Sequence, residues 1–214
     1  MSDFKEVEDF LRVLDSEFKS KINLYFIGGV VLLYQELKPA TKDIDLIVRS
    51  RKDFSALKNA LEKLKFESLK PDFSYSRLNL SEIFQKDNLR LDLFEREVCG
   101  KFFLSDNMVK RSRKILSFNN LNVFLVSNED IFLFKSMTER EGDLSDCIAL
   151  AKRGLNWDVV LSELLYQSKA KNKDVWITWV GERFDILEER GLNIPIMSDV
   201  NKLRDAFFRS LEGD

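Results

Sequence analysis

Hydrophobic positions in the first half of the chain switch repeatedly between helical and strand spacing. Apolar residues recur at helical spacing over 3–20, which predicts an amphipathic helix. A short apolar strand is expected at 24–27, followed by a helix at 30–37. Residues 43–48 alternate in the two-residue period of a strand. Further strands are expected at 66–69, 75–80, 89–94 and 121–126, and further helices at 54–64 and 106–114.

The second half of the chain has helical spacing almost throughout. Ser127 and Asp130 form the ends of a capping box before this part, and Gly154 and Gly191 are expected to end helices. No Pro/Gly/Ser-rich linker separates the halves. We therefore expect a core at about 1–127 and a helical region at 128–214 that packs on it. The helices in this region are expected at 131–138, 143–153, 158–169, 174–190 and 198–211.

Composition removes several classes of chemistry. The chain has 0 histidines, which excludes Ser-His-Asp and Cys-His catalysis, zinc sites built on histidine and ribonucleases that use one. Cys99 and Cys147 lack metal-type spacing, and two thiols in a chain of this size predict a reduced, cytoplasmic protein. The acidic N-terminus is unlike a signal peptide, and no apolar run is long enough to span a bilayer. The formal net charge is -2, so a global basic field for nucleic acid is absent.

Three aspartates stand on two of the expected strands in positions that can meet. Residues two apart in a strand share a face, so Asp43 and Asp45 project together. Asp92 lies on the face of its strand that is opposite to the neighbouring leucines. If the strands are neighbours, the carboxylates converge, and a like-charge pair about 4 Å apart costs on the order of 4 kcal/mol at an effective dielectric of roughly 20. A divalent cation removes this repulsion. Ligand oxygens without histidine or cysteine favour Mg²⁺ or Mn²⁺.

Gly28 and Gly29 separate the strand at 24–27 from the helix that follows. Glycine allows the backbone to approach a phosphate closely, and a helix N-terminus offers free N–H groups. Two metal ions can hold the attacking and leaving oxygens of an in-line phosphoryl displacement. We therefore expect the triphosphate of a nucleotide at these glycines.

Gly28-Gly29, the run Thr41-Lys42-Asp43-Ile44-Asp45-Leu46, and Asp92 on a later strand resemble the signature of the DNA polymerase β-like nucleotidyltransferase superfamily. The likeness covers about residues 20–95, extends more loosely over 127–146, and is greatest to minimal prokaryotic members. These include the abortive-infection type nucleotidyltransferases of toxin–antitoxin systems.

The resemblance implies an α/β fold, with a mixed sheet flanked by helices and a C-terminal helical region. It implies transfer of a nucleoside monophosphate from an NTP such as ATP to a hydroxyl, with magnesium or manganese and with pyrophosphate leaving. By the same resemblance, Asp43 and Asp45 bind both metal ions. Asp92 binds the catalytic metal and accepts the proton of the attacking hydroxyl.

Other side chains have both a functional and a structural interpretation. Thr41 either orients Asp43 or contacts a phosphate, or it is a turn residue before the strand. Lys135 either forms a surface ion pair with Glu139 or, by the resemblance, reaches the nucleotide phosphates or the acceptor. Many family members have Gly-Ser where this chain has Gly-Gly, so one hydroxyl that contacts phosphate is missing. Asp143 and Asp146 either hold Lys135 or Arg140 in place or are charges at the start of a helix. The basic run is either a solvated helix face or an RNA contact; it comprises Lys110, Arg111, Arg113 and Lys114. Further candidate pocket residues are Tyr75, Arg77, Asn79 and Arg90.

The acceptor hydroxyl stays open. An RNA or tRNA end suits a toxin, a hydroxyl on a partner protein suits an antitoxin that silences its toxin, and an antibiotic is a third choice. The alternative from another class is a catalytically silent binding module, or an antitoxin acting by complex formation. The intact aspartates argue against that alternative, because an idle acidic cluster is an electrostatic cost.

Overall fold

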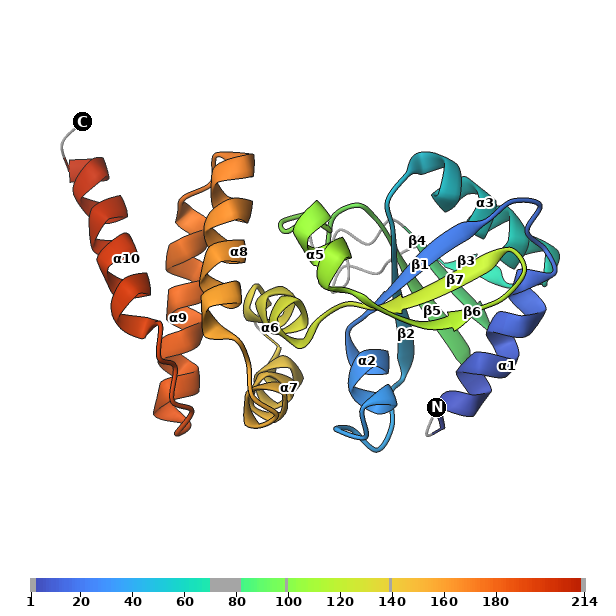
Figure 1. Cartoon of the computed structure of the whole chain (residues 1–214), viewed down its shortest axis with the longest axis horizontal. Helices are drawn as coiled ribbons and strands as arrows, with labels where there is room; N and C mark the ends of the chain where they lie inside the picture. The colour runs from blue at the N-terminus through green and yellow to red at the C-terminus, as the bar shows by residue number, and fades with distance from the viewer. Residues whose placement is uncertain (1–2, 70–81, 99, 139, 213–214) are drawn as a thin grey trace. The chain divides into compact units, whose positions relative to one another are not determined.

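A computed structural model of the chain describes residues 3–69, 82–98, 100–138 and 140–212 (Figure 1). The chain divides into two compact units, Met1–Ser127 and Asn128–Asp214. The first unit carries the sheet and the second is helical.

The described part of the first unit forms a seven-stranded sheet in the order β3-β4-β5-β2-β1-β7-β6. Strand pairs β1–β7 and β2–β5 are parallel, and the other neighbours are antiparallel. This mixed sheet with flanking helices confirms the predicted fold class. The elements are α1 (Phe4–Asp15), β1 (Ile22–Ile27), α2 (Gly29–Tyr34), β2 (Asp43–Val48), α3 (Arg51–Lys63), β3 (Glu67–Leu69), β4 (Glu82–Lys86), β5 (Leu89–Glu95), α5 (Asp106–Arg111), β6 (Arg113–Ser117) and β7 (Leu121–Leu125).

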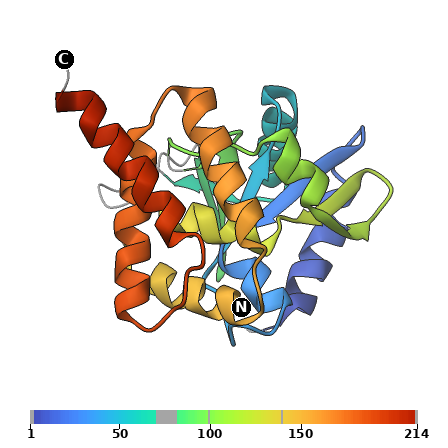
Figure 2. The same cartoon turned by 60° about the vertical axis from the view of Figure 1, so that its left-hand side comes forward.

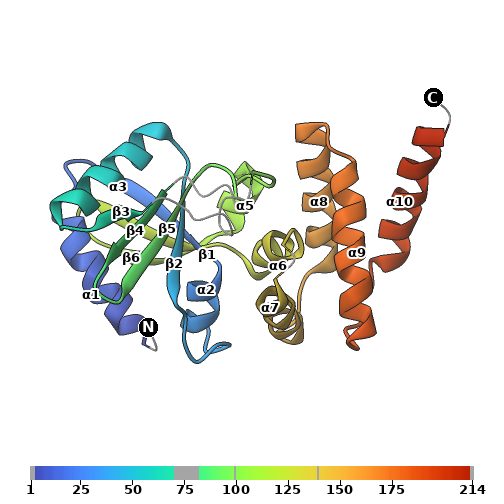
Figure 3. The same ribbon diagram turned by 180° about the vertical axis from the view of Figure 1, so that it is seen from behind.

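Helix α1 covers the face of the sheet that is turned away from the aspartates. Phe26 of β1 is paired with Leu46 of β2, and both are buried. The ring of Phe4 on α1 meets the ring of Phe26 edge-on, with centroids 6.4 Å apart. Because side chains alternate along β2, Asp43 and Asp45 project from the other face. Figures 1 and 3 show this unit from opposite sides, with α1 and α3 next to the strands of the sheet.

The second unit is a helical bundle. Helix α6 packs against α7, α8 and α9, and α10 packs against α9 (Figure 2). Its aromatic core joins Phe132 to Trp157 and Phe184, with ring centroids 5.3 and 5.6 Å away. The helices are α6 (Asn128–Ser136), α7 (Glu141–Lys152), α8 (Trp157–Lys171), α9 (Val175–Glu189) and α10 (Met197–Glu212).

Both glycines expected to end helices do so. Gly154 follows α7 and Gly191 follows α9, each with a positive φ, of 89° and 84° respectively. After α9, the N–H of Leu192 donates to the carbonyl of Leu187 at 3.0 Å, as in a Schellman motif. None of the helices in the described ranges is long and apolar enough to cross a lipid bilayer.

Some elements differ from the expected ones. The helix expected at 106–114 ends at Arg111, and residues 113–117 instead form β6, an edge strand paired with β7. Strand β4 was not predicted, and the helix expected over 3–20 ends at Asp15. The side chain of Asp15 accepts a hydrogen bond from the backbone of Asn120 at 2.7 Å, a contact that local spacing does not reveal. The strand expected at 75–80 lies outside the described residues.

Candidate active site

The register of two adjacent strands brings the three aspartates to one face of the sheet. Strands β2 and β5 are parallel neighbours, with Asp45 directly opposite Asp92 and Asp43 directly opposite Arg90. Side chains two residues apart share a face, so all four project together. The Asp43 side chain is 28% exposed and that of Asp92 only 5%. Solvent therefore reaches the cluster from the Asp43 side.

Gly28 leaves room for one of these carboxylates. It ends β1 beside β2, where Ile27 is paired with Asp45. Its backbone has φ 66° and ψ −146°, a combination that residues with a Cβ rarely adopt. A Cβ at position 28 would lie 2.0 Å from Oδ2 of Asp45. The carboxylate therefore rests against bare backbone, and any side chain there would displace it.

Gly29 makes the same kind of fit with Thr41. A Cβ at position 29 would lie 2.5 Å from Oγ1 of Thr41 and 3.3 Å from its Cβ. The Thr41 hydroxyl donates to the backbone carbonyl of Asp43 at 3.1 Å. The Gly-Gly turn and the strand with the aspartates are thus shaped to each other. Gly29 also begins α2, which has only six residues, so its dipole contributes little to anion binding.

Arg90, named from the sequence as a candidate pocket residue, lies among the carboxylates, and its ion pairs with them were not predicted. Its Nε and Nη2 donate to Oδ1 and Oδ2 of Asp92 at 2.8 and 3.1 Å. Nε also lies 3.4 Å from Oδ1 of Asp43. Among the described residues no group of three or more carboxylate or thiol side chains is arranged to hold a metal. The sequence offered one sign of this ion pair: Arg90 stands two positions before Asp92 on the same strand, so the two side chains share a face.

Lys135 is held inside the second unit. Its ammonium donates to Asp143 at 2.7 Å and to Asp146 at 2.8 Å, and the residue is only 7% exposed. Burial by itself lowers the pKa of Lys135, but the two carboxylates outweigh burial and leave the pKa raised. Arg140 also donates to Asp143, at 2.7 Å. A surface ion pair is therefore the wrong description of Lys135, and Glu139 lies outside the described residues.

The basic run expected on one helix face is divided between two elements. Lys110 and Arg111 end α5, whereas Arg113 and Lys114 begin β6. Arg113 lies over the ring of Tyr34 at 5.5 Å, and Lys114 lies over another aromatic ring at 5.9 Å. The four residues therefore do not form the single solvated helix face that their spacing suggested. Tyr75, Arg77 and Asn79 lie outside the described residues.

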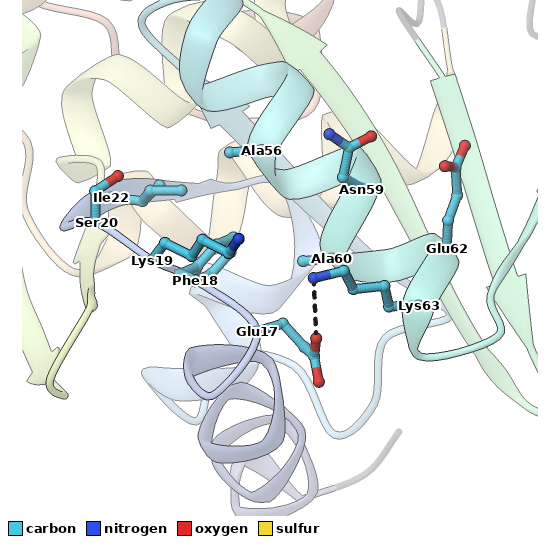
Figure 4. A pocket seen from close by; sticks show the side chains of 10 residues that line it. All are labelled: Glu17, Phe18, Lys19, Ser20, Ile22, Ala56, Asn59, Ala60, Glu62 and Lys63. Atoms are coloured by element: carbon cyan, nitrogen blue, oxygen red, sulfur yellow. Dashed lines mark ion pairs between the residues drawn. The ribbon is translucent and has the colours of Figure 1, made fainter.

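A cavity of about 640 Å³ lies elsewhere in the first unit (Figure 4). It is lined by the segment after α1, by the start of β1 at Ile22, and by α3. Lys63 reaches Glu17 at 3.6 Å in the cavity wall (Figure 4). Because β1 begins at this cavity and ends beside Asp45, the two features lie at opposite ends of the strand. The cavity contains none of the predicted site residues.

A mixed sheet that presents aspartates from adjacent parallel strands, beside a Gly-Gly turn, is the arrangement of a polymerase β-like nucleotidyltransferase. The chain belongs to the family described as "Nucleotidyltransferase of unknown function (DUF6036)", whose model matches residues 2–179. The family confirms the resemblance that the motifs indicated. Helix α10 lies beyond the matched residues.

The chain is similar to several solved structures, one of them with a TM-score above 0.5. The crystal structure of ANT(2″)-Ia in complex with adenylyl-2″-tobramycin is similar, with a TM-score of 0.52 and 11% sequence identity, over 79% of this chain and 99% of that one. The solution structure of ANT(2″)-Ia gives 0.49 and 12%, over 87% and 95%. JHP933 from Helicobacter pylori gives 0.44 and 14%, over 98% and 96%. No curated protein matches the chain. At such low identity the likeness to ANT(2″)-Ia establishes the fold alone.

Proposed function

We propose that this chain transfers a nucleoside monophosphate from an NTP to a hydroxyl, with Asp43, Asp45 and Asp92 as ligands of Mg²⁺ or Mn²⁺. The observation that carries the proposal is the β2–β5 register. It sets Asp45 opposite Asp92, with Asp43 on the same face and the bare backbone of Gly28 against Asp45. Because the chain belongs to a nucleotidyltransferase family, this cluster is the candidate catalytic site.

The chemistry of these residues fits a divalent cation. Every donor is a carboxylate oxygen, as Mg²⁺ and Mn²⁺ prefer. Arg90 lies between Asp43 and Asp92, as expected of a positive side chain near a cluster with net negative charge. When bound, the metal would neutralise phosphate charge and polarise the transferred phosphoryl group.

The chain's own residues bind and orient the reactants in this proposal. The triphosphate would lie beside Gly28 and Gly29, whose missing side chains make room for Asp45 and Thr41. The oxygen of the acceptor hydroxyl bonds to the α-phosphorus while the bond to pyrophosphate breaks, and Asp92 accepts the proton that this hydroxyl loses. Thr41 supports Asp43 through its hydrogen bond to the backbone there. The contacts of Lys135 favour a packing role over the nucleotide contact that the resemblance implied.

Three acceptor classes fit such a site: an RNA or tRNA end, a hydroxyl of a partner protein, and a small molecule. The first two correspond to a toxin and an antitoxin of a toxin–antitoxin pair. The third is suggested by the adenylyl-2″-tobramycin in complex with ANT(2″)-Ia, which shares the fold. Incubating the protein with cell lysate and each α-labelled NTP separates these classes, because label moves to RNA, to protein or to small molecules.

The decisive experiment compares two Asp→Asn variants. Nucleotide binding by calorimetry and pyrophosphate release are measured with and without Mg²⁺ or Mn²⁺ for the wild type, for the double variant Asp43→Asn/Asp45→Asn, and for Asp87→Asn. Asp87 makes the same chemical change at an exposed turn between β4 and β5. Metal-dependent binding should fall more than about tenfold in the double variant, or about 1.4 kcal/mol, and stay unchanged in the control. Nucleotide affinity that changes neither with metal nor with the double substitution contradicts the proposal.

A silent binding module is the second candidate, and one observation favours it. In the structure Arg90 already pairs with Asp92 and lies beside Asp43, so it offsets one of the cluster's negative charges without a metal. This candidate predicts no pyrophosphate release with any NTP and stable co-purification with a partner protein. The two candidates differ in whether Arg90 is a permanent counter-ion or one that leaves.

A further inference from the structure

Arg90 uses the same oxygen atoms that a metal ion would need. Its two hydrogen bonds occupy one lone-pair direction on each oxygen of Asp92, in the forked geometry that makes Arg–carboxylate pairs strong. Its Nε is also 3.4 Å from Asp43. The Arg90 side chain is 21% exposed, so it has open space on one side.

The positions along the two strands show why this contact forms. Arg90 is directly opposite Asp43 in the β2–β5 register, and it precedes Asp92 by two residues on β5. Both neighbours are therefore on its own face, within reach of a long side chain. A cation bridging Asp43 and Asp92 would enter the space that the guanidinium holds. Both cannot bind these carboxylates fully at once, because like charges repel at such distances.

We propose that Arg90 is a built-in competitor of the divalent metal, and that its guanidinium must leave Asp43 and Asp92 before the metal binds. This inference rests on the proposed function of the same site. It explains why the described carboxylates form no ready-made metal site although three of them share one face. The triphosphate offers the displaced guanidinium another anionic partner, so nucleotide binding favours its release. Metal affinity is consequently low without nucleotide and rises when nucleotide is present.

The test measures Mn²⁺ binding by electron paramagnetic resonance, with and without a non-hydrolysable NTP, for the wild type, Arg90→Gln, Arg90→Lys and Arg51→Gln. Arg51 is the matched control, an exposed arginine at the start of α3 that pairs with Glu95 at 2.8 Å. Arg90→Gln should bind Mn²⁺ about tenfold more tightly than the wild type in the absence of nucleotide, which corresponds to about 1.4 kcal/mol. Arg90→Lys, which keeps the charge but loses the fork, should fall between them, and Arg51→Gln should match the wild type.

Thermal unfolding gives a second readout that is independent of activity. Without metal, Arg90→Gln should unfold at a lower temperature than the wild type, because its carboxylates lose their counter-charge. Saturating Mn²⁺ should close that gap. If Arg90→Gln fails to fold, Arg90→Lys carries the comparison.

The possible failures are distinguishable. Equal or weaker Mn²⁺ binding by Arg90→Gln overturns the competition but leaves the metal site standing. No Mn²⁺ binding by any of the four proteins, with or without nucleotide, overturns the proposed function and the competition with it.

Discussion

Replacing Lys135 with methionine should strongly destabilise the helical unit. Methionine keeps an unbranched side chain but removes the charge that Asp143 and Asp146 share. Removing one partner of a buried ion pair costs about 3–5 kcal/mol, because an uncompensated charge stays buried. Arg140 continues to pair with Asp143, so we expect about 3 kcal/mol. For a unit of this size, that corresponds to a decrease in Tm of about 12–24 °C.

Tryptophan fluorescence measures this loss in the relevant unit. All three tryptophans of the chain, Trp157, Trp176 and Trp179, lie in the helical unit. Urea unfolding followed by their emission therefore reports the free energy of unfolding of that unit. Lys152→Met is the matched control, because Lys152 is exposed at the end of α7, and its loss should cost less than about 1 kcal/mol.

The pH dependence gives the sharpest check on the physical reason. Burial by itself raises the pKa of Asp143, but Lys135 and Arg140 outweigh burial and leave the pKa lowered. The stability that Asp143 contributes is therefore complete above its ordinary pKa of 3.8, and it is lost as the pH falls through the lower folded value. Lys135 contributes below its ordinary pKa of 10.5, and that contribution is lost as the pH rises through the raised folded value.

The methionine variant should behave in the opposite way at acid pH. Without the Lys135 ammonium, burial of Asp143 outweighs the charge of Arg140. The pKa of the Asp143 carboxyl then rises above its unfolded value. Stability of the variant should then increase as the pH falls from 7 toward 5, while these groups leave the wild type unchanged in that window. A cost below about 1 kcal/mol, or identical pH profiles for the two proteins, would refute the buried-pair argument.

Three further predictions concern glycines and a thiol. Gly28→Ala should cost about 1–3 kcal/mol in strain and weaken Mn²⁺ binding, because its Cβ would lie 2.0 Å from the Asp45 carboxylate. Thermal unfolding measures the first effect and Mn²⁺ titration the second, and unchanged values would contradict this geometry. Gly29→Ser should be destabilising by itself but less so in a Thr41→Gly background, because the serine Cβ would clash with Thr41. A double-mutant cycle in which the two losses of unfolding free energy simply add would contradict the contact. Burial raises the pKa of the Cys147 thiol to about 12. In a Cys99→Ser variant we therefore expect negligible alkylation of Cys147 at pH 8 until urea unfolds the helical unit. Fast labelling of the folded protein would contradict this.

Much of the fold was accessible from local patterns. The alternation over 43–48 predicted β2, and the apolar residues around Asp92 predicted β5, because side-chain alternation is a property of one strand. Gly154 and Gly191 ended helices as expected, since a positive φ is a local requirement. By contrast, residues 113–117 carry no clear strand period. They become β6 because β7 offers hydrogen-bonding partners along its edge.

The sequence by itself determined which face of each strand carries an aspartate, that histidine chemistry is absent, and that Gly-Gly stands directly after β1. Only the tertiary structure decided that β2 and β5 are neighbours in a register that pairs Asp45 with Asp92. It alone placed Arg90 between two carboxylates, and Lys135 against Asp143 and Asp146 in the bundle interior. The physical reason is that a strand or helix period specifies directions within one element. The partner that a charge meets depends instead on which elements pack together, and in what register.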